Sequence, residues 1–162
     1  MSMPVRRSCH TIAWACLLFL SGCGTIFGPS VDGSPSEIEQ TTFSLVNGYR
    51  RSLGLAELAW NEILAEAARG HSRDMAEGRS VFGHSGFEER IAAIGKSIPW
   101  TKIAENVAYT SSAENAVDGW IRSLEHKVNL EGDYRLSGVG AAMNKSGTGF
   151  YITQIFIRPR DN

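Results

Sequence analysis

A few ionisable side chains occupy positions that suggest chemistry rather than simple solvation. His84 lies in the run Phe-Gly-His-Ser-Gly-Phe that begins at Phe82. Glycines on both sides let the backbone approach a pocket closely, and an imidazole can move protons or bind metals near neutral pH. His84 is therefore a candidate for a binding or catalytic site.

Glu105 interrupts the otherwise mostly apolar segment 103–108. A buried carboxylate needs a cationic or protonated partner, because removing an unpaired charge from water is costly. We expect His84 or His126 to face it, since the segment's neighbour Lys102 lies on the same face only if a bulge intervenes. A solvent-facing Glu105 at a strand end is the alternative interpretation.

His126 follows Ser123 by three residues, so both lie on one face if the predicted helix persists that far. A serine nucleophile with a histidine base would fit acyl transfer. No nucleophile-elbow pattern and no identifiable oxyanion donor supports that scheme. Glu125 points about 100° away around the helix axis and supplies a carboxylate to the site only if the helix end unwinds.

His71 belongs to the apolar stripe of a predicted helix, together with Leu64, Ala68 and Met75. A histidine on such a stripe is usually a packing residue whose ring nitrogens are hydrogen-bonded. We predict that role for His71, with a ligand role as the alternative.

Hydrophobic spacing predicts the elements that must position these side chains. Helices are expected at 36–52, from a cap at Asn61 to just before Gly78, near 87–94, and from Ser112 with an inward stripe that ends at Leu124. Ser36 and Glu39 have the spacing of a capping box for the first helix.

Strands are predicted at 103–109, 138–143 and 150–157, and the turn-rich segment 144–149 joins the last two into a β-hairpin. The final strand is largely apolar on both sides, which indicates a sheet covered on both faces. Helices first and an antiparallel hairpin last predict a single α+β domain with helices on either side of a sheet.

The N-terminal part is predicted to be a targeting segment. Arg6 and Arg7 precede an uncharged run at 11–20, about half the length that crosses a bilayer, which ends in Leu-Ser-Gly-Cys at Cys23. These four residues resemble a bacterial lipobox. We expect a cleaved signal at 1–22, a lipid anchor on Cys23, a flexible tether at 23–35 and a folded domain at 36–160. An ordinary secretory signal is the alternative.

Charge and cysteine content narrow the function classes. Sixteen Lys plus Arg against seventeen Asp plus Glu give a formal net charge of -1, so the chain has no excess positive charge to attract nucleic acid. The three cysteines all lie at or before Cys23, so the folded domain is expected to have no disulfide.

Several short motifs follow one another in order along the chain: Leu45, Val46, Asn47 with Arg50; Leu58 to Asn61; Ala68, His71, Ser72, Asp74, Met75; Phe82 to Ser85; Ala104 to Asn106; Trp120, Ser123, His126, Asn129, Leu130; Gly138 to Gly140; and Thr153, Gln154, Phe156. Together they resemble the CAP superfamily, which contains cysteine-rich secretory proteins, antigen 5 and plant pathogenesis-related 1 proteins.

The resemblance implies a three-layer α-β-α sandwich with a mainly antiparallel central sheet and a cleft lined by two histidines and two acids. The matching positions here are His84, Glu105 and His126, with Ser123 where many eukaryotic relatives have the second acid. The chain departs from the family pattern at that position, and it also lacks the disulfides of eukaryotic members.

Such a cleft allows two kinds of chemistry. His84, His126 and Glu105 could bind Zn²⁺ or a similar divalent ion with water in an open position, or form a metal-free hydrogen-bonded pair that holds a polar ligand. We expect a ligand-binding rather than a catalytic domain, monomeric and tethered by Cys23 in a bacterial envelope. In a Gram-negative host, Gly24 after the cysteine indicates the outer membrane. The expected ligand is a small molecule, a lipid or an envelope component. The alternative is a metal-dependent hydrolase of envelope peptide or glycan.

Overall fold

The structure is a computed structural model that describes residues 31 and 33–161. In chain order its elements are α1 (Pro35–Ser52), β1 (Ala59–Trp60), α2 (Glu62–Ala76), α3 (Phe87–Gly95), β2 (Trp100–Thr110), α4 (Ala113–Arg122), α5 (Leu124–Leu130), β3 (Leu136–Met143) and β4 (Phe150–Pro159). All of the predicted helices and strands are present.

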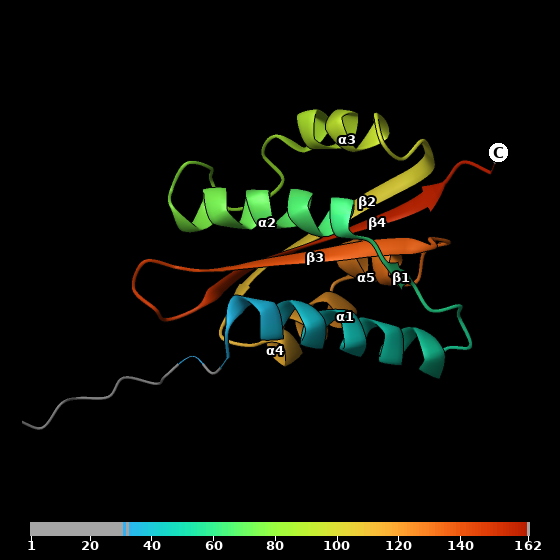
Figure 1. Ribbon diagram of the computed structural model, residues 1–162. Coiled ribbons are helices and arrows are strands. Elements are labelled where there is room, and N and C mark those ends of the chain that lie inside the picture. The colour runs from blue at the N-terminus through green and yellow to red at the C-terminus, as the bar shows by residue number, and fades with distance from the viewer. Residues whose placement is uncertain (1–30, 32, 162) are drawn as a thin grey trace, which may run out of the picture.

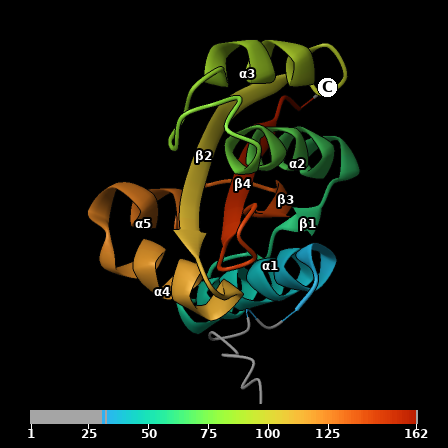
Figure 2. The same cartoon turned by 90° about the vertical axis from the view of Figure 1, so that its left-hand side faces the viewer.

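A central sheet separates two helical layers. Helices α2 and α3 lie on one face and α1 and α4 on the other, with α5 beside β2 at the sheet edge (Figures 1 and 2). Alternate residues of β4 enter the two cores: Ile152 and Phe156 pack with α1 and α4, whereas Ile155 and Ile157 pack with α2 and α3. The predicted α+β sandwich is confirmed, and its sheet is covered on both faces.

The sheet has the strand order β1-β3-β4-β2. The predicted β3–β4 hairpin is confirmed, and β2 is antiparallel to β4. The short strand β1 pairs in parallel with β3, so the sheet is mixed rather than purely antiparallel. This arrangement leaves β2 as an edge strand, and β2 carries Glu105.

Two glycines of β3 allow α2 to lie directly on the sheet. A Cβ atom added to Gly140 would stand 2.0 Å from the backbone nitrogen of Arg69, and one added to Gly138 would stand 2.2 Å from that of Ala65. Asn61 caps α2 as predicted, because its side chain accepts a hydrogen bond from the Leu64 amide. Helix α2 is thereby fixed against the sheet, with His71 in its buried face.

The start of α1 differs from the prediction. The capping box consists of Ser34 and Glu37 instead of Ser36 and Glu39, because Pro35 occupies the first helical turn and moves the cap upstream. Glu39 is buried and accepts hydrogen bonds from Arg69 at 2.8 to 3.0 Å. It therefore links α1 to α2 instead of capping α1.

The helix predicted from Ser112 begins as expected but ends earlier. Ser123 has extended backbone angles and separates α4 from α5. Leu124 is 79% exposed, so the prediction that it continues the inward stripe of α4 is wrong. The break changes the helical phase, which turns Leu124 away from the core.

The predicted signal segment, Cys23 and most of the predicted tether lie outside the described residues. Among the residues that are described, no helix has both the length and the hydropathy needed to cross a bilayer.

Candidate functional site

The His84 side chain is held over the sheet by the loop between α2 and α3. Gly83 has a φ of 131°, a left-handed value that residues with a side chain rarely adopt. The Gly83 carbonyl accepts a hydrogen bond from Nε2 of His71 at 2.7 Å. His71 is 3% exposed, so its predicted buried, hydrogen-bonded role is confirmed. This contact fixes the loop one residue before His84.

His84 and Glu105 meet directly. Nδ1 of His84 lies 2.9 Å from Oε1 of Glu105, and the His84 side chain remains 52% exposed. The Glu105 side chain is only 1% exposed, which excludes the solvent-facing alternative. The carboxylate therefore orients the ring from below and leaves Nε2 of His84 as the outer nitrogen.

The main cationic partner of Glu105 is Arg90 of α3. Its Nε lies 3.0 Å from Oε2, and its Nη2 lies 2.8 Å from each carboxylate oxygen. The prediction that a cationic or protonated group faces Glu105 is confirmed. The predicted partners, however, were His84 and His126, and they did not include Arg90. A guanidinium offers donors in a planar fork that matches a carboxylate, so this buried charge is neutralised by an arginine.

His126 and Ser123 form a second pair at the edge of the sheet. Nδ1 of His126 lies 2.8 Å from the Ser123 hydroxyl, as their spacing predicts. Burial and the positive charge of His84 lower the pKa of His126, and the nearby charge of Glu125 opposes that shift. The two histidines are therefore electrostatic neighbours, while Glu105 is hydrogen-bonded only to the first.

Side chains from α4 and α5 cap the outer edge of β2. Trp120 donates to the Val107 carbonyl at 3.2 Å, and Asn129 donates to the side-chain oxygen of Asn106 at 2.9 Å. Asn106 in turn donates to the His126 carbonyl at 3.2 Å. An exposed edge strand can pair with another chain, and these contacts both restrict such pairing and fix α5 next to the site.

A cavity of about 270 Å³ opens between these elements. It is lined by His84, Phe87, Ile103, Ala104, Glu105 and Asn129. Ser123 and His126 do not line it, so the structure places the four predicted cleft residues as two neighbouring pairs. The cavity combines an imidazole and an amide with an aromatic ring and aliphatic side chains, a composition that suits a ligand with both polar and apolar parts.

The predicted three-ligand metal centre does not fit this geometry. Both oxygens of Glu105 accept hydrogen bonds from Arg90, and one also contacts His84. Within the described ranges, no three His, Cys, Asp or Glu side chains are grouped closely enough to hold an ion. His84 and His126 could each offer Nε2, but catalytic zinc sites use three protein ligands.

The residues that sequence reasoning missed are Arg90 and Phe87. Arg90 lies 15 positions before Glu105, in a helix that the sequence predicted without indicating which face it turns to β2. The one available signal was the buried carboxylate itself, which requires a cation. Asn129 belongs to the quoted motifs but was not assigned to the site.

The buried His71 and the partly buried His126 predict how stability depends on pH. Burial lowers the pKa of both His71 and His126 below the ordinary value of 6.5. As the pH falls, these two histidines therefore take up protons at a higher pH in the unfolded chain than in the folded protein. The free energy of unfolding should therefore decrease as the pH drops from about 7.5 to about 5.5. Urea denaturation at several pH values tests this, and His126→Gln should reduce the slope. Constant stability across the window would contradict it.

The chain is similar to known proteins in sequence and in fold. A curated relative, the uncharacterized membrane protein YlbC of Bacillus subtilis, is 34% identical over 127 residues, or 74% of this chain. The chain spans 34% of the length of that relative.

Two solved structures have the same fold. An extracellular protein with an SCP domain from Bacillus anthracis has a TM-score of 0.63 and 30% identity, over 78% of this chain and 44% of its own length. An outer surface protein of Borrelia burgdorferi has a TM-score of 0.69 and 20% identity, over 79% of this chain and 97% of its own. The model of the cysteine-rich secretory protein family, named CAP, matches residues 43–156. The chain therefore belongs to the cysteine-rich secretory protein (CAP) family.

Proposed function

We propose that this protein is a lipid-anchored, extracytoplasmic CAP domain that binds a fragment of the cell envelope in the cavity beside His84 and Glu105. The observation that carries the proposal is the His84–Glu105–Arg90 arrangement. A half-exposed imidazole is held in one orientation by a buried carboxylate, whose charge is neutralised from the other side.

This arrangement favours binding over turnover. Pre-orienting His84 reduces the entropy that a ligand must offset on binding, so one hydrogen bond at Nε2 contributes more than it would on a free side chain. Phe87 and Ile103 supply apolar surface in the lining of the cavity. A peptide or glycan fragment carries both polar groups and apolar faces, and it suits such a cavity.

A metal-dependent hydrolase is the other function that the sequence allows. It would need a third protein ligand besides His84 and His126, and Glu105 is hydrogen-bonded to Arg90 instead. The pair formed by Ser123 and His126 lies outside the cavity lining, so it supports no nucleophilic scheme there. Ligand binding is therefore the function that we propose.

The extracytoplasmic location rests on the lipobox-like sequence at Cys23 and on the relatives. Their descriptions name a membrane protein, an extracellular protein and an outer surface protein. All three descriptions suit a domain that works outside the cytoplasm. A lipid on Cys23 would keep such a domain at the membrane surface.

The binding proposal predicts the behaviour of two variants. Soluble glycopeptide fragments released from purified peptidoglycan serve as the probe, and NMR spectra of the detergent-solubilised full chain report binding. His84→Ala and Phe87→Ala should each weaken binding at least tenfold with the fold intact, because each removes a cavity wall. The matched control is Phe82→Ala, which should leave binding unchanged because Phe82 is 58% exposed and does not line the cavity. Absence of binding by the unaltered chain, or full binding by His84→Ala, would contradict the proposal.

The anchoring proposal predicts a change of location. The chain produced in a bacterial host should partition with membranes and incorporate labelled fatty acid, because acylation adds about 0.8 kcal/mol for each buried methylene. Cys23→Ala should abolish the labelling and release the domain from the membrane. Cys16→Ala is the control, since Cys16 lies inside the predicted signal. Equal labelling of Cys23→Ala and the unaltered chain would refute the anchor.

A further inference from the structure

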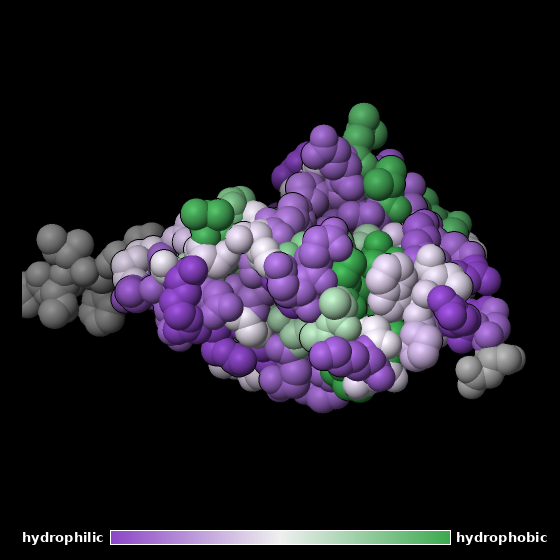
Figure 3. All heavy atoms as spheres, turned by 90° about the horizontal axis from the view of Figure 1, so that it is seen from above, coloured by the Kyte–Doolittle hydropathy of each residue, from purple (hydrophilic) through white to green (hydrophobic). Residues whose placement is uncertain are grey.

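One end of the domain carries an aromatic patch, formed by Val81, Phe82, Tyr109 and Tyr151. Val81 and Phe82 are 75% and 58% exposed, and Tyr109 is 46% exposed. The ring centroids of Phe82 and Tyr151 are 6.2 Å apart, and those of Tyr109 and Tyr151 are 4.7 Å apart. Figure 3 shows a hydrophobic group at the left-hand end of a face that is mostly hydrophilic. The patch therefore forms a continuous row across β2, β4 and the loop between α2 and α3.

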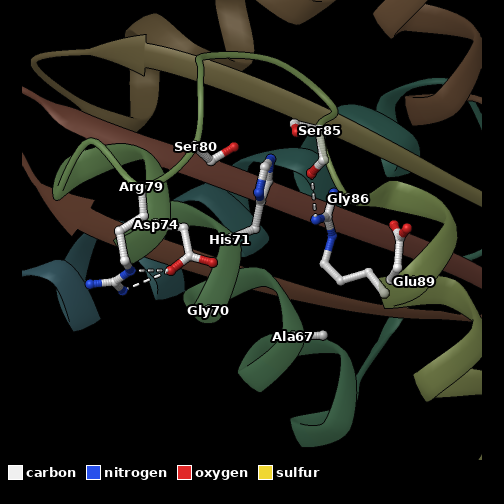
Figure 4. A pocket seen from close by; sticks show the side chains of 10 residues that line it. Ala67, Gly70, His71, Asp74, Arg79, Ser80, Ser85, Gly86 and Glu89 are labelled. Atoms are coloured by element: carbon white, nitrogen blue, oxygen red, sulfur yellow. Dashed lines mark hydrogen bonds and ion pairs between the residues drawn. The ribbon is translucent and has the colours of Figure 1, made fainter.

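The loop that carries residues 81–82 is fixed on both sides of them. Before them, the Ser80 amide donates to the backbone carbonyl of Asp74 at 3.1 Å. After them, the Gly83 carbonyl accepts from His71 at 2.7 Å. Figure 4 shows the two α2 residues beneath this loop. The two apolar side chains are thus held in water by the loop, and exposed apolar surface of this kind marks contact with another molecule or with a membrane.

The charges next to the patch are of both signs and contact one another. Arg79 forms ion pairs with Asp74, at 2.7 Å, and with Glu77 (Figure 4). The Lys145 ammonium donates to the backbone carbonyl of Glu77 at 3.0 Å. These side chains do not form the basic cluster that anionic lipids or nucleic acids attract. The patch therefore offers apolar and aromatic contact, and a surface without strong net charge is the partner that suits it.

The patch lies at the end of the domain where α1 begins (Figure 1). Pro35 of α1 lines a groove together with Ala142 of β3, and Ala142 is paired with Tyr151. Val31 packs against the core formed with α1 and α4, and eight peptide bonds join it to Cys23, which span at most about 28 Å. A lipid on Cys23 would therefore keep this end near the membrane. Such tethering raises the effective concentration, so even a weak contact is occupied.

We propose that the aromatic patch rests in the headgroup region of the membrane that carries the anchor. The proposal depends on the lipid at Cys23 and goes beyond it, because it fixes how the domain is oriented. Phe82 and Val81 supply apolar side chains for the acyl boundary, and tyrosines favour the headgroup level because their rings are apolar and their hydroxyls polar. Tyr109 accepts a hydrogen bond from Asn144 at 2.6 Å, so its own O–H can donate to a lipid oxygen.

Docking in this way would set the distance between the lipid and the cavity beside His84. Glu105 and Tyr109 lie on the same face of β2, and four residues of a strand span about 13 Å. Glu105 lines that cavity. The cavity would therefore lie above the headgroups, where it meets envelope fragments instead of lipid.

The test measures the orientation of the full chain on a lipid surface. The chain is produced in a bacterial host so that Cys23 is acylated, and it is inserted into phosphatidylcholine nanodiscs that contain a nitroxide-labelled lipid, which broadens the NMR signals of nearby amides. Val81 and Phe82 should lose about fivefold more intensity than Leu53, which caps the far end of α1, about 27 Å from its start. Replacing part of the phosphatidylcholine by phosphatidylglycerol should leave this ratio unchanged, because the contact is apolar.

Two pairs of serine substitutions test the residues. Val81→Ser combined with Phe82→Ser removes the exposed apolar tip and should lower the intensity ratio to about one, with the fold intact. Leu124→Ser combined with Val128→Ser is the matched control, because these residues of α5 are 79% and 61% exposed, and it should leave the ratio unchanged. His84→Ala should also leave it unchanged, so failure of the envelope-fragment proposal is distinguishable from failure of this one.

Labelled fatty acid in the same samples separates docking from anchoring. An acylated chain with equal broadening at Val81 and Leu53 would overturn the docking and leave the anchor intact. A chain without the label would remove the anchor and this proposal with it. A patch that binds a protein or a glycan instead would give no broadening in nanodiscs made only of lipid, which also overturns the proposal. The same holds if the control pair on α5 lowers the ratio as much as the pair at 81–82.

Discussion

Replacing Gly140 by alanine should destabilise the domain by about 3 kcal/mol or more, a large part of the roughly 5 to 15 kcal/mol that holds a domain folded. The new Cβ would stand 2.0 Å from the Arg69 nitrogen and 2.3 Å from the Ala68 carbonyl carbon. These are backbone atoms in the middle of α2, so no side-chain rotation relieves the overlap. The helix must move away from β3, which also displaces His71 and the loop that carries His84.

Urea denaturation of the Gly140→Ala variant measures this effect. Gly119→Ala is the control, because its Cβ meets open space and alanine has the higher helix propensity. We expect Gly119→Ala to be neutral or stabilising by up to about 1 kcal/mol. If both substitutions have the same small effect, α2 and β3 do not pack as closely as the structure shows.

Replacing Arg90 by leucine should cost about 3 to 5 kcal/mol, because the substitution leaves the carboxylate of Glu105 buried without its main partner. The side chains of Arg90 and Glu105 are 14% and 1% exposed, so water cannot replace the lost guanidinium. His84 should also lose its fixed orientation. We therefore expect binding of the envelope fragment to weaken together with the free energy of unfolding.

A double-mutant cycle distinguishes the charge effect from lost packing. Glu105→Gln combined with Arg90→Leu removes the buried charge and should recover at least half of the lost stability. Arg122→Leu is the surface control, because the Arg122 and Asp118 side chains are 73% and 66% exposed, and it should change stability by less than about 0.5 kcal/mol. A double mutant as unstable as Arg90→Leu alone would show that Arg90 acts through packing.

The family relationship explains the fold, but the ligand has to be inferred from the side chains of the site. This chain covers 34% of one relative and 97% of another, and their descriptions name locations rather than activities. The arrangement around His84, in which a partly buried arginine neutralises the buried carboxylate, comes from this chain's own residues. Fold membership by itself does not transfer an activity, which is why each proposal is tested on named side chains.

Much of the local structure could be predicted from the sequence. Hydrophobic spacing located all of the longer helices and strands, and Asn61 was recognised as a cap. These features depend on neighbours within about four residues, so short-range patterns suffice. The first helix shows the limit, since Ser34 and Ser36 both have an acid three positions on. Only the position of Pro35 decides between the two boxes.

The site was determined partly by sequence and partly by tertiary structure. An apolar strand with a single carboxylate already required a partner for Glu105, and glycines beside His84 already indicated a close approach, because burial of charge and backbone freedom are properties of residue type. The identity of Arg90 as that partner and the separation of Ser123 and His126 from the cavity follow only from how α3 and α5 lie beside β2. Such contacts join residues 15 or more positions apart, and no local pattern encodes the relative orientation of two packed elements.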